Sequence, residues 1–289
     1  MQAKLRKSAA LLLGAVAAYP LAAAAAPSFG PMFGDHAVIQ RDHPVIVRGR
    51  AVAGEVVTVT LNTVSRRSTA GADGRFEARF DPVSTAGPIS LIAEAASGRV
   101  EAKDVVVGDV FLCSGQSNME MEVRHAQDAV GQIRGSADDQ LRLMTVAKAV
   151  ADEPRADFET PPVWKAASPQ SVPDFSAVCY YMARELRKSA GVPVGAIASS
   201  WGGSQISPWM GEAAQAAVGR SARTALLKRH ARDSVDGERA ASAEWESWWR
   251  KATGDAPGKE PWQPGAAIDW ADMPKTEPWE EWGVPALAA

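Results

Sequence analysis

Residues 27–107 alternate apolar and polar side chains with a period of two. The clearest stretches are residues 45–49, 55–61, 75–80, 89–94 and 100–105. Such alternation is typical of strands that bury one face, and the Gly-Ala-Asp-Gly string at 71–74 predicts a turn between two of them. The pattern predicts a small antiparallel β-sandwich domain. Because these strands carry no aromatic platform, we favour a domain that packs on its neighbour over a carbohydrate-binding module.

After residue 107 the pattern changes to strands that alternate with helices. Strands are predicted at 110–113, 141–146 and 192–198, and helices at 118–130 and 176–186. A Pro-rich loop containing Trp164 is expected after the second strand, and Asp174 or Ser176 is a suitable cap for the second helix. Strand, helix and strand in this order predict a parallel sheet, so residues 108–240 are interpreted as an α/β domain with its active groups at the carboxyl ends of the strands.

The first 26 residues have the composition of a secretory signal peptide. Lys4, Arg6 and Lys7 precede an apolar run over 9–18, and an alanine-rich stretch ends at Ala26. The run is too short and too rich in alanine for a membrane span, so we expect export to the periplasm or the medium rather than stable membrane insertion.

The composition of the chain argues against some classes of partner and cofactor. The chain is 46% hydrophobic and 22% charged, as in globular proteins, and loss of the three basic leader residues would change its formal charge from −3 to −6. An acidic protein of this kind is a poor partner for nucleic acid. The sequence shows no zinc spacing, so no metal is predicted. Cys113 and Cys179 lie among apolar residues and are interpreted as buried thiols, although an exported protein would allow them to pair.

The most informative chemistry follows the strand at 110–113, where Gly115-Gln116-Ser117-Asn118 leads into helix-compatible residues. This layout presents a serine hydroxyl on a tight strand-to-helix turn, with Gly115 as the bend and with unpaired N–H groups of the helix nearby. Ser117 is therefore the candidate nucleophile, and Gln116 and Asn118 would support it.

A second glycine-containing loop follows the strand at 192–198. Gly202 and Gly203 would lie at the same edge of the sheet as Ser117. Because glycine lets a backbone amide approach a ligand closely, the N–H of Ser117 and that of Gly202 or Gly203 are candidate oxyanion donors.

No histidine stands where a general base is expected. His36 and His43 belong to the predicted β-domain, and His230 lies in a charged helical segment. His125 lies eight residues after Ser117, about 12 Å along a continuous helix, which is too far for direct proton transfer. We interpret His125 and Glu122 as a surface pair.

The string Gly115 to Met119 resembles the first sequence block of SGNH hydrolases, in the branch that holds sialate O-acetylesterases. The segments 174–181 and 199–209 carry the same resemblance. It implies removal of O-acetyl groups from sialic acid or a related sugar, by Ser117, without a cofactor. The family's Gln-Gly-Glu and Asp-x-x-His strings have no counterpart here, and Ser204 and Ser207 depart from the expected second block.

The last segment, residues 241–289, contains seven of the ten tryptophans among many Pro, Gly and charged residues. One interpretation is that these tryptophans stack on sugars. The interpretation that we favour is that residues 241–289 begin an inserted region whose remainder is missing from this chain. We therefore expect a truncated chain that is hydrolytically weak. An acetylxylan esterase, a non-catalytic carbohydrate-binding protein and an inactive fragment are the alternatives, and the sequence gives no indication of oligomeric state.

Overall fold

The computed structural model describes residues 25–264, except 85 and 152. Its strands are β1 (Ser28–Phe29), β2 (Val38–Gln40), β3 (Val45–Arg50), β4 (Val56–Leu61), β5 (Val64–Thr69), β6 (Arg75–Phe80), β7 (Gly87–Ala95), β8 (Gly98–Gly115), β9 (Asp138–Thr145), β10 (Trp164–Ala167) and β11 (Val194–Ser200). Its α-helices are α1 (Ser117–Glu120), α2 (Ala129–Arg134), α3 (Ala177–Ala190), α4 (Glu212–Ala217), α5 (Ser221–Arg232) and α6 (Ser234–Thr253). Single 3-10 turns η1 (Pro31–Phe33), η2 (Val123–His125) and η3 (Ser207–Trp209) complete the elements.

The alternating pattern of residues 27–107 corresponds to strands of two sheets, and their buried residues belong to one core. One sheet has the order β1-β3-β6, and β4, β5 and β7 belong to the second. Val47 of β3, Phe76 of β6, Val59 of β4 and Leu91 of β7 are all buried in this core. Strand β5 was not predicted from the sequence, because its residues are almost all exposed and do not alternate between apolar and polar.

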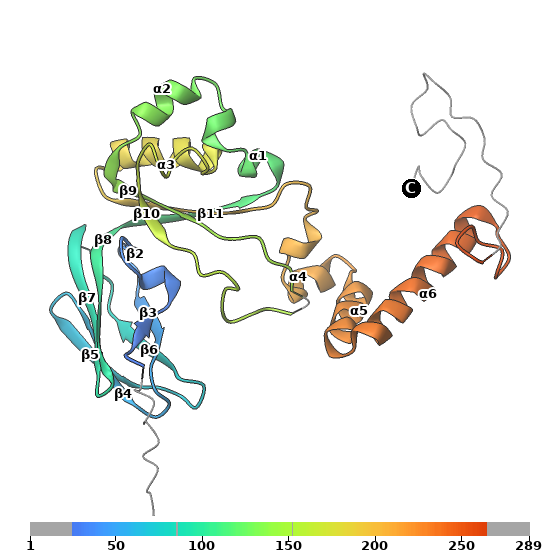
Figure 1. The fold of residues 1–289 in the computed structure, drawn as a ribbon, viewed down its shortest axis with the longest axis horizontal. Coiled ribbons are helices and arrows are strands. Elements are labelled where there is room, and N and C mark those ends of the chain that lie inside the picture. Colours follow the sequence, from blue (N-terminus) through green and yellow to red (C-terminus); the bar gives the residue numbers. More distant parts are fainter. Residues whose placement is uncertain (1–24, 85, 152, 265–289) are drawn as a thin grey trace, which may run out of the picture.

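Strand β8 connects the two parts of the chain. It runs without interruption over 18 residues, pairing antiparallel with β7 and later parallel with β11. Val105, Val106 and Val107 are all buried, so the apolar run continues through the change of pattern at residue 107. Both parts therefore share one eight-stranded sheet (Figure 1). Seven strands follow the order β10-β9-β11-β8-β7-β4-β5, and the eighth, β2, pairs with β8 beside this path.

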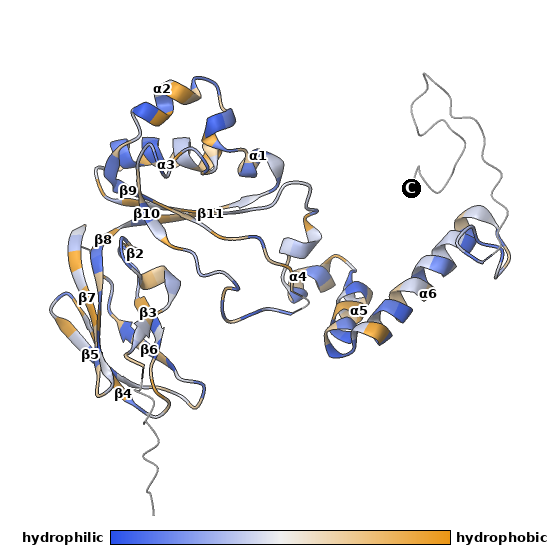
Figure 2. Cartoon of the chain, in the orientation of Figure 1, coloured by the Kyte–Doolittle hydropathy of each residue, from blue (hydrophilic) through white to orange (hydrophobic). Residues whose placement is uncertain are grey.

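The predicted α/β arrangement with parallel strands is confirmed around β11. This strand pairs parallel with β8 on one side and with β9 on the other, and β10 closes the edge antiparallel to β9. Figure 2 shows apolar residues concentrated along this layer. Helix α3 covers one face, where Tyr180 and Ala183 are buried against Val194 and Ala196 in a second core. Ser176 caps the helix by accepting the N–H of Cys179 at 3.2 Å.

The single helix predicted over 118–130 is wrong, because the structure has α1, η2 and α2 in its place. Bonds to the segment before α3 replace the helical ones: Ala177 N–H donates to the Met121 carbonyl at 2.8 Å, and Val123 N–H donates to the Phe175 carbonyl at 3.0 Å. Met121 accordingly leaves the helical region, at ψ 121°. Packing against a distant segment has overridden local helix propensity.

The interpretation of Cys113 and Cys179 as thiols is also wrong. The two form a disulfide, with a Cα–Cα separation of 5.9 Å and a sequence separation of 66 positions. Cys113 lies near the end of β8 and Cys179 in the first turn of α3, so the bond fastens this helix to the strand that precedes Ser117. Nothing in the local sequence reveals that distance, because it depends on how α3 is laid across the sheet.

Trp164, predicted in a loop, instead opens β10. Its ring is buried, and its indole N–H donates to the Met32 carbonyl at 3.3 Å. Strand β10 has only four residues, which is too short for an alternating pattern to be recognised after the proline-rich run.

Helices α5 and α6 form an arm that extends away from the sheets (Figure 1). The weak periodicity of the sequence after residue 240 predicted no helix there, but α6 continues to Thr253. The rings of Trp245, Trp248 and Trp249 on α6 lie beside one another, and Trp262 from the segment after α6 packs against Trp245 and Trp249. Trp270, Trp279 and Trp282 lie outside the described residues, as do residues 1–24 of the predicted leader. Within the described ranges, no helix is long and apolar enough to cross a membrane.

Candidate active site

Ser117 is exposed as the first residue of α1, directly after β8. The bend before it requires glycine: Gly115 has φ +148°, and a Cβ there would lie 2.8 Å from Met119 Cγ. The Gln116 carbonyl accepts the N–H groups of both Met119 and Glu120 at 2.9 Å, which shapes the turn. Asn118 is exposed beside the serine. Because α1 has only four residues, its dipole is weaker than the predicted long helix would supply.

The loop after β11 lies against this turn, as its position in the sequence predicts. Ser200 pairs with Gly115 across the two parallel strands, and Trp201 N–H donates to the Gly115 carbonyl at 2.9 Å. A Cβ on Gly202 would lie 3.6 Å from the Cα of Ser117. The structure therefore brings Ser117 and Gly202 together across the carboxyl ends of β8 and β11.

The two loop glycines are not equivalent. Gly202 donates its N–H to Oε2 of Glu120, so this amide is already bound. Gly203 is exposed, with φ +76° and no heavy atom within 4 Å of where its Cβ would be. Among the described contacts, the Gly202 amide is therefore bound to Glu120, and no hydrogen bond is described for the Gly203 amide.

Glu120 and Lys148 belong to the site, and the sequence reasoning missed both. Oε1 of Glu120 pairs with the Lys148 ammonium, which lies 5.7 Å from the centre of the Trp201 ring. The hydrogen bond from Lys148, followed by that from Gly202, holds the pKa of Glu120 below its ordinary value. The position of Glu120, three residues after Ser117, could have indicated that it lies near the serine. Lys148 follows β9, and nothing in its local sequence indicates that it lies near Ser117.

The histidines have partners away from Ser117. His36 Nδ1 lies 2.7 Å from Asp104, which also binds the buried Arg142. His43 Nδ1 lies 3.1 Å from the Arg41 carbonyl. None of these contacts of His36 and His43 involves Ser117.

The other two histidines lie on short helical elements. His125 is exposed in η2, with its Nδ1 3.8 Å from Glu122, so the predicted surface pair is present. His230 lies in α5, where its backbone and Cβ pack against Gly237 of α6. Because α1 ends at Glu120, the separation of 12 Å expected along one continuous helix does not apply to His125.

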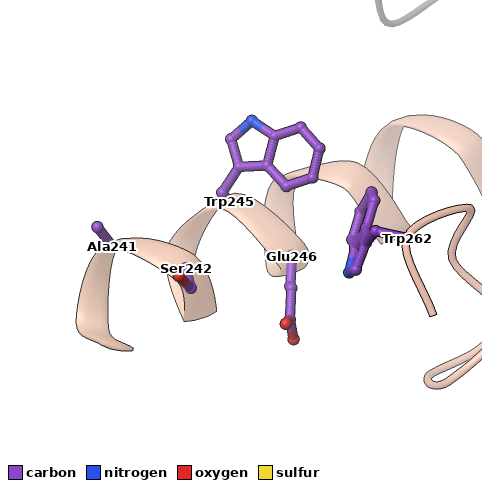
Figure 3. A pocket seen from close by; sticks show the side chains of 5 residues that line it. All are labelled: Ala241, Ser242, Trp245, Glu246 and Trp262. Atoms are coloured by element: carbon purple, nitrogen blue, oxygen red, sulfur yellow. The ribbon is translucent and has the colours of Figure 1, made fainter. Parts of the chain in front are cut away.

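Two pockets lie outside this turn. One opens beside the carboxyl end of β9 and is lined by Thr145, Lys165 and Asp174, among others. The other lies on α6 between Trp245 and Trp262, with Glu246 beside them (Figure 3). The rings of Trp245 and Trp262 pack on each other, with centroids 4.5 Å apart. In the described part of the chain, no group of three His, Cys, Asp or Glu residues is arranged to hold a metal ion.

Comparison with known proteins gives a consistent result. The chain is 30% identical to sialate O-acetylesterase of Rattus norvegicus over 209 residues, which is 66% of this chain and 39% of that protein. It is 28% identical to the Homo sapiens sialate O-acetylesterase over 238 residues, 75% of this chain and 44% of that one. No protein-family model matches the sequence.

A solved structure agrees in fold. The crystal structure of a carbohydrate acetylesterase from Xanthomonas citri superposes with a TM-score of 0.63 at 36% identity, covering 66% of this chain and 43% of that one. The chain thus spans about two fifths of the length of the curated relatives it matches. The resemblance first indicated by the Gly-Gln-Ser-Asn-Met string is confirmed: the described chain is similar in sequence to sialate O-acetylesterases and in fold to a carbohydrate acetylesterase.

Proposed function

We propose that this chain carries the nucleophile of an esterase that removes O-acetyl groups from sialic acid or a related sugar. The observation that carries the proposal is the meeting of Ser117 with the Trp201–Gly203 loop, at the carboxyl ends of two parallel strands. An exposed serine beside backbone amides on glycine is the arrangement that acyl transfer needs.

In the proposed reaction, Ser117 Oγ attacks the acetyl carbonyl carbon and gives up its proton to a base. The carbonyl oxygen becomes an oxyanion, for which the N–H groups of Ser117 and Gly203 are the proposed donors. The bond to the sugar oxygen then breaks, the sugar leaves with a proton, and water hydrolyses the acetyl-serine to acetate. The base is not assigned, because none of the contacts described for His36, His43 and His125 involves Ser117.

The choice of sugar rests on the relatives. The proteins matched in sequence are sialate O-acetylesterases, whereas the matched structure is described as a carbohydrate acetylesterase. An O-acetylated sialic acid is therefore our first substrate, and another acetylated glycan such as acetylxylan is the second candidate. No cofactor is needed for this chemistry.

Two further proposals concern the setting of the site. We propose that residues 27–107 form a β-sandwich domain that supports the sheet, since its two sheets share one core. We also propose that the chain is exported. The basic and apolar pattern of residues 1–26 supports this, as does the disulfide between Cys113 and Cys179, because such bonds persist in oxidising compartments.

The test is to replace the nucleophile. Ser117→Ala should lower turnover of p-nitrophenyl acetate by about 10³-fold or more where a base is in place. Ser114→Ala is the matched control, because Ser114 is also exposed but lies on β8 three residues earlier. If Ser117→Ala keeps the turnover of the Ser114→Ala variant, Ser117 is not the nucleophile.

A further inference from the structure

Glu120 connects the ends of three neighbouring strands. It closes the short helix that begins at Ser117, after β8. One carboxylate oxygen accepts the N–H of Gly202, after β11, and the other pairs with Lys148, after β9. A single side chain thus links the serine turn, the glycine loop and the segment after β9.

Other contacts fix the same loop less directly. Ser200 Oγ donates to the Met119 carbonyl at 3.3 Å, and Trp201 N–H donates to the Gly115 carbonyl. Both contacts lie before Gly202, so they leave the glycines free to turn. In the described structure, the bond from Gly202 to Glu120 is the one that ties the glycine pair itself to the turn bearing Ser117.

The contact has little to do with global stability. The side chains of Glu120 and Lys148 are 32% and 45% exposed, and ion pairs open to solvent in this way contribute little to the stability of the fold. A small displacement of a positioned group, however, can lower a rate by about 10²-fold. The consequence of losing the carboxylate should therefore be seen in turnover rather than in unfolding.

We propose that Glu120 is a positioning residue for the proposed esterase, holding the Gly202–Gly203 loop against Ser117, with Lys148 as its counter-charge. The inference rests on the proposed function. It also assigns the Gly202 amide to Glu120 and leaves the Gly203 amide for the oxyanion.

Kinetics give the first test. Glu120→Ala should lower kcat for p-nitrophenyl acetate by about 10- to 100-fold while KM changes less than about threefold, because positioning acts on the transition state. Glu120→Gln keeps an oxygen that can accept the Gly202 N–H and should recover most of the loss. Glu122→Gln is the matched control: Glu122 is similarly exposed but pairs with Arg124 at 3.0 Å, and it should have no effect.

Hydrogen exchange gives a second test that does not depend on turnover. The amide of Gly202 should be protected in the wild-type chain and in Glu122→Gln, and it should exchange about tenfold faster in Glu120→Ala. Unchanged melting temperatures would show that the variants are folded. Equal exchange at Gly202 in Glu120→Ala and Glu122→Gln would overturn the proposal, even where turnover is too low to measure.

The two measurements separate the failure of this inference from failure of the proposed function. If Ser117 is needed but Glu120→Ala turns over like Glu122→Gln, the positioning role is wrong and the esterase stands. If Ser117→Ala keeps full turnover while Gly202 still depends on Glu120 for protection, the structural link holds but does not serve this reaction, and the positioning role is again wrong.

Discussion

The disulfide between Cys113 and Cys179 should account for a large share of the stability of the chain. In the chain-entropy treatment, closing a loop of 66 residues stabilises the folded state by about 4 kcal/mol. The bond also fixes α3 to the end of β8, four residues before Ser117. Reduction should therefore lower the free energy of unfolding by about that amount, equivalent to a fall of roughly 1–2 M in the urea midpoint.

The assay is urea unfolding with and without a reductant. Both cysteines are buried, so the unlinked control is Cys113→Ala with Cys179→Ala, which adds no buried hydroxyl. The wild-type midpoint should fall on reduction, and the midpoint of the control should not respond. Two free thiols in the unfolded, unreduced protein, or a wild-type midpoint indifferent to reductant, would refute the reasoning.

Three further outcomes are expected. Gly203→Ala should lower the free energy of unfolding by about 1–2 kcal/mol, because φ is +76° there. Gly202→Ala should instead displace the Glu120 carboxylate and lower kcat about tenfold or more, with little change in melting temperature. A larger loss of stability in Gly202→Ala, or a larger loss of kcat in Gly203→Ala, would contradict the structure. The bond from the buried Arg142, and then that from His36, lowers the pKa of Asp104, so stability from this group is present above the pKa of the unfolded state and is lost as pH falls through the lower folded pKa. Urea unfolding from pH 5 downward should show that loss in the wild type but not in Asp104→Asn, and parallel pH profiles would exclude it. Turnover of acetate esters by the 289-residue chain should be low, because no base is assigned to Ser117 and a positioned base contributes about 10²- to 10⁴-fold. Added imidazole should raise the turnover that depends on Ser117, measured as the difference between the wild type and Ser117→Ala. High turnover without imidazole would show that a base is already in place.

The strands and the serine turn could be predicted because local rules govern them. Alternation placed β3, β4, β6 and β7, since each has one face in the core. Gly115 and Ser117 stand out in the sequence because the sharp bend demands glycine. The proximity of Gly202 followed from the rule that parallel strands end at one edge.

The rest depends on contacts between distant segments. Met121 leaves the helix because its carbonyl accepts Ala177 N–H, 56 positions later. The disulfide and the Glu120–Lys148 pair likewise depend on how α3 and β9 are placed, which no local pattern reveals. A four-residue α1 in place of a long helix also means that the proposed oxyanion site would rely on individual backbone amides more than on a helix dipole.

The most direct test of the central claim is to locate the reactive serine by covalent labelling. A fluorophosphonate that reacts with activated serines, releasing fluoride as the Oγ–P bond forms, should modify the peptide that contains Ser117. Mass spectrometry after prolonged incubation should find the added mass on Ser117 and not on Ser114, and Ser117→Ala should abolish it. Label on Ser114, Ser199 or Ser200 with Ser117 unmodified would contradict the account.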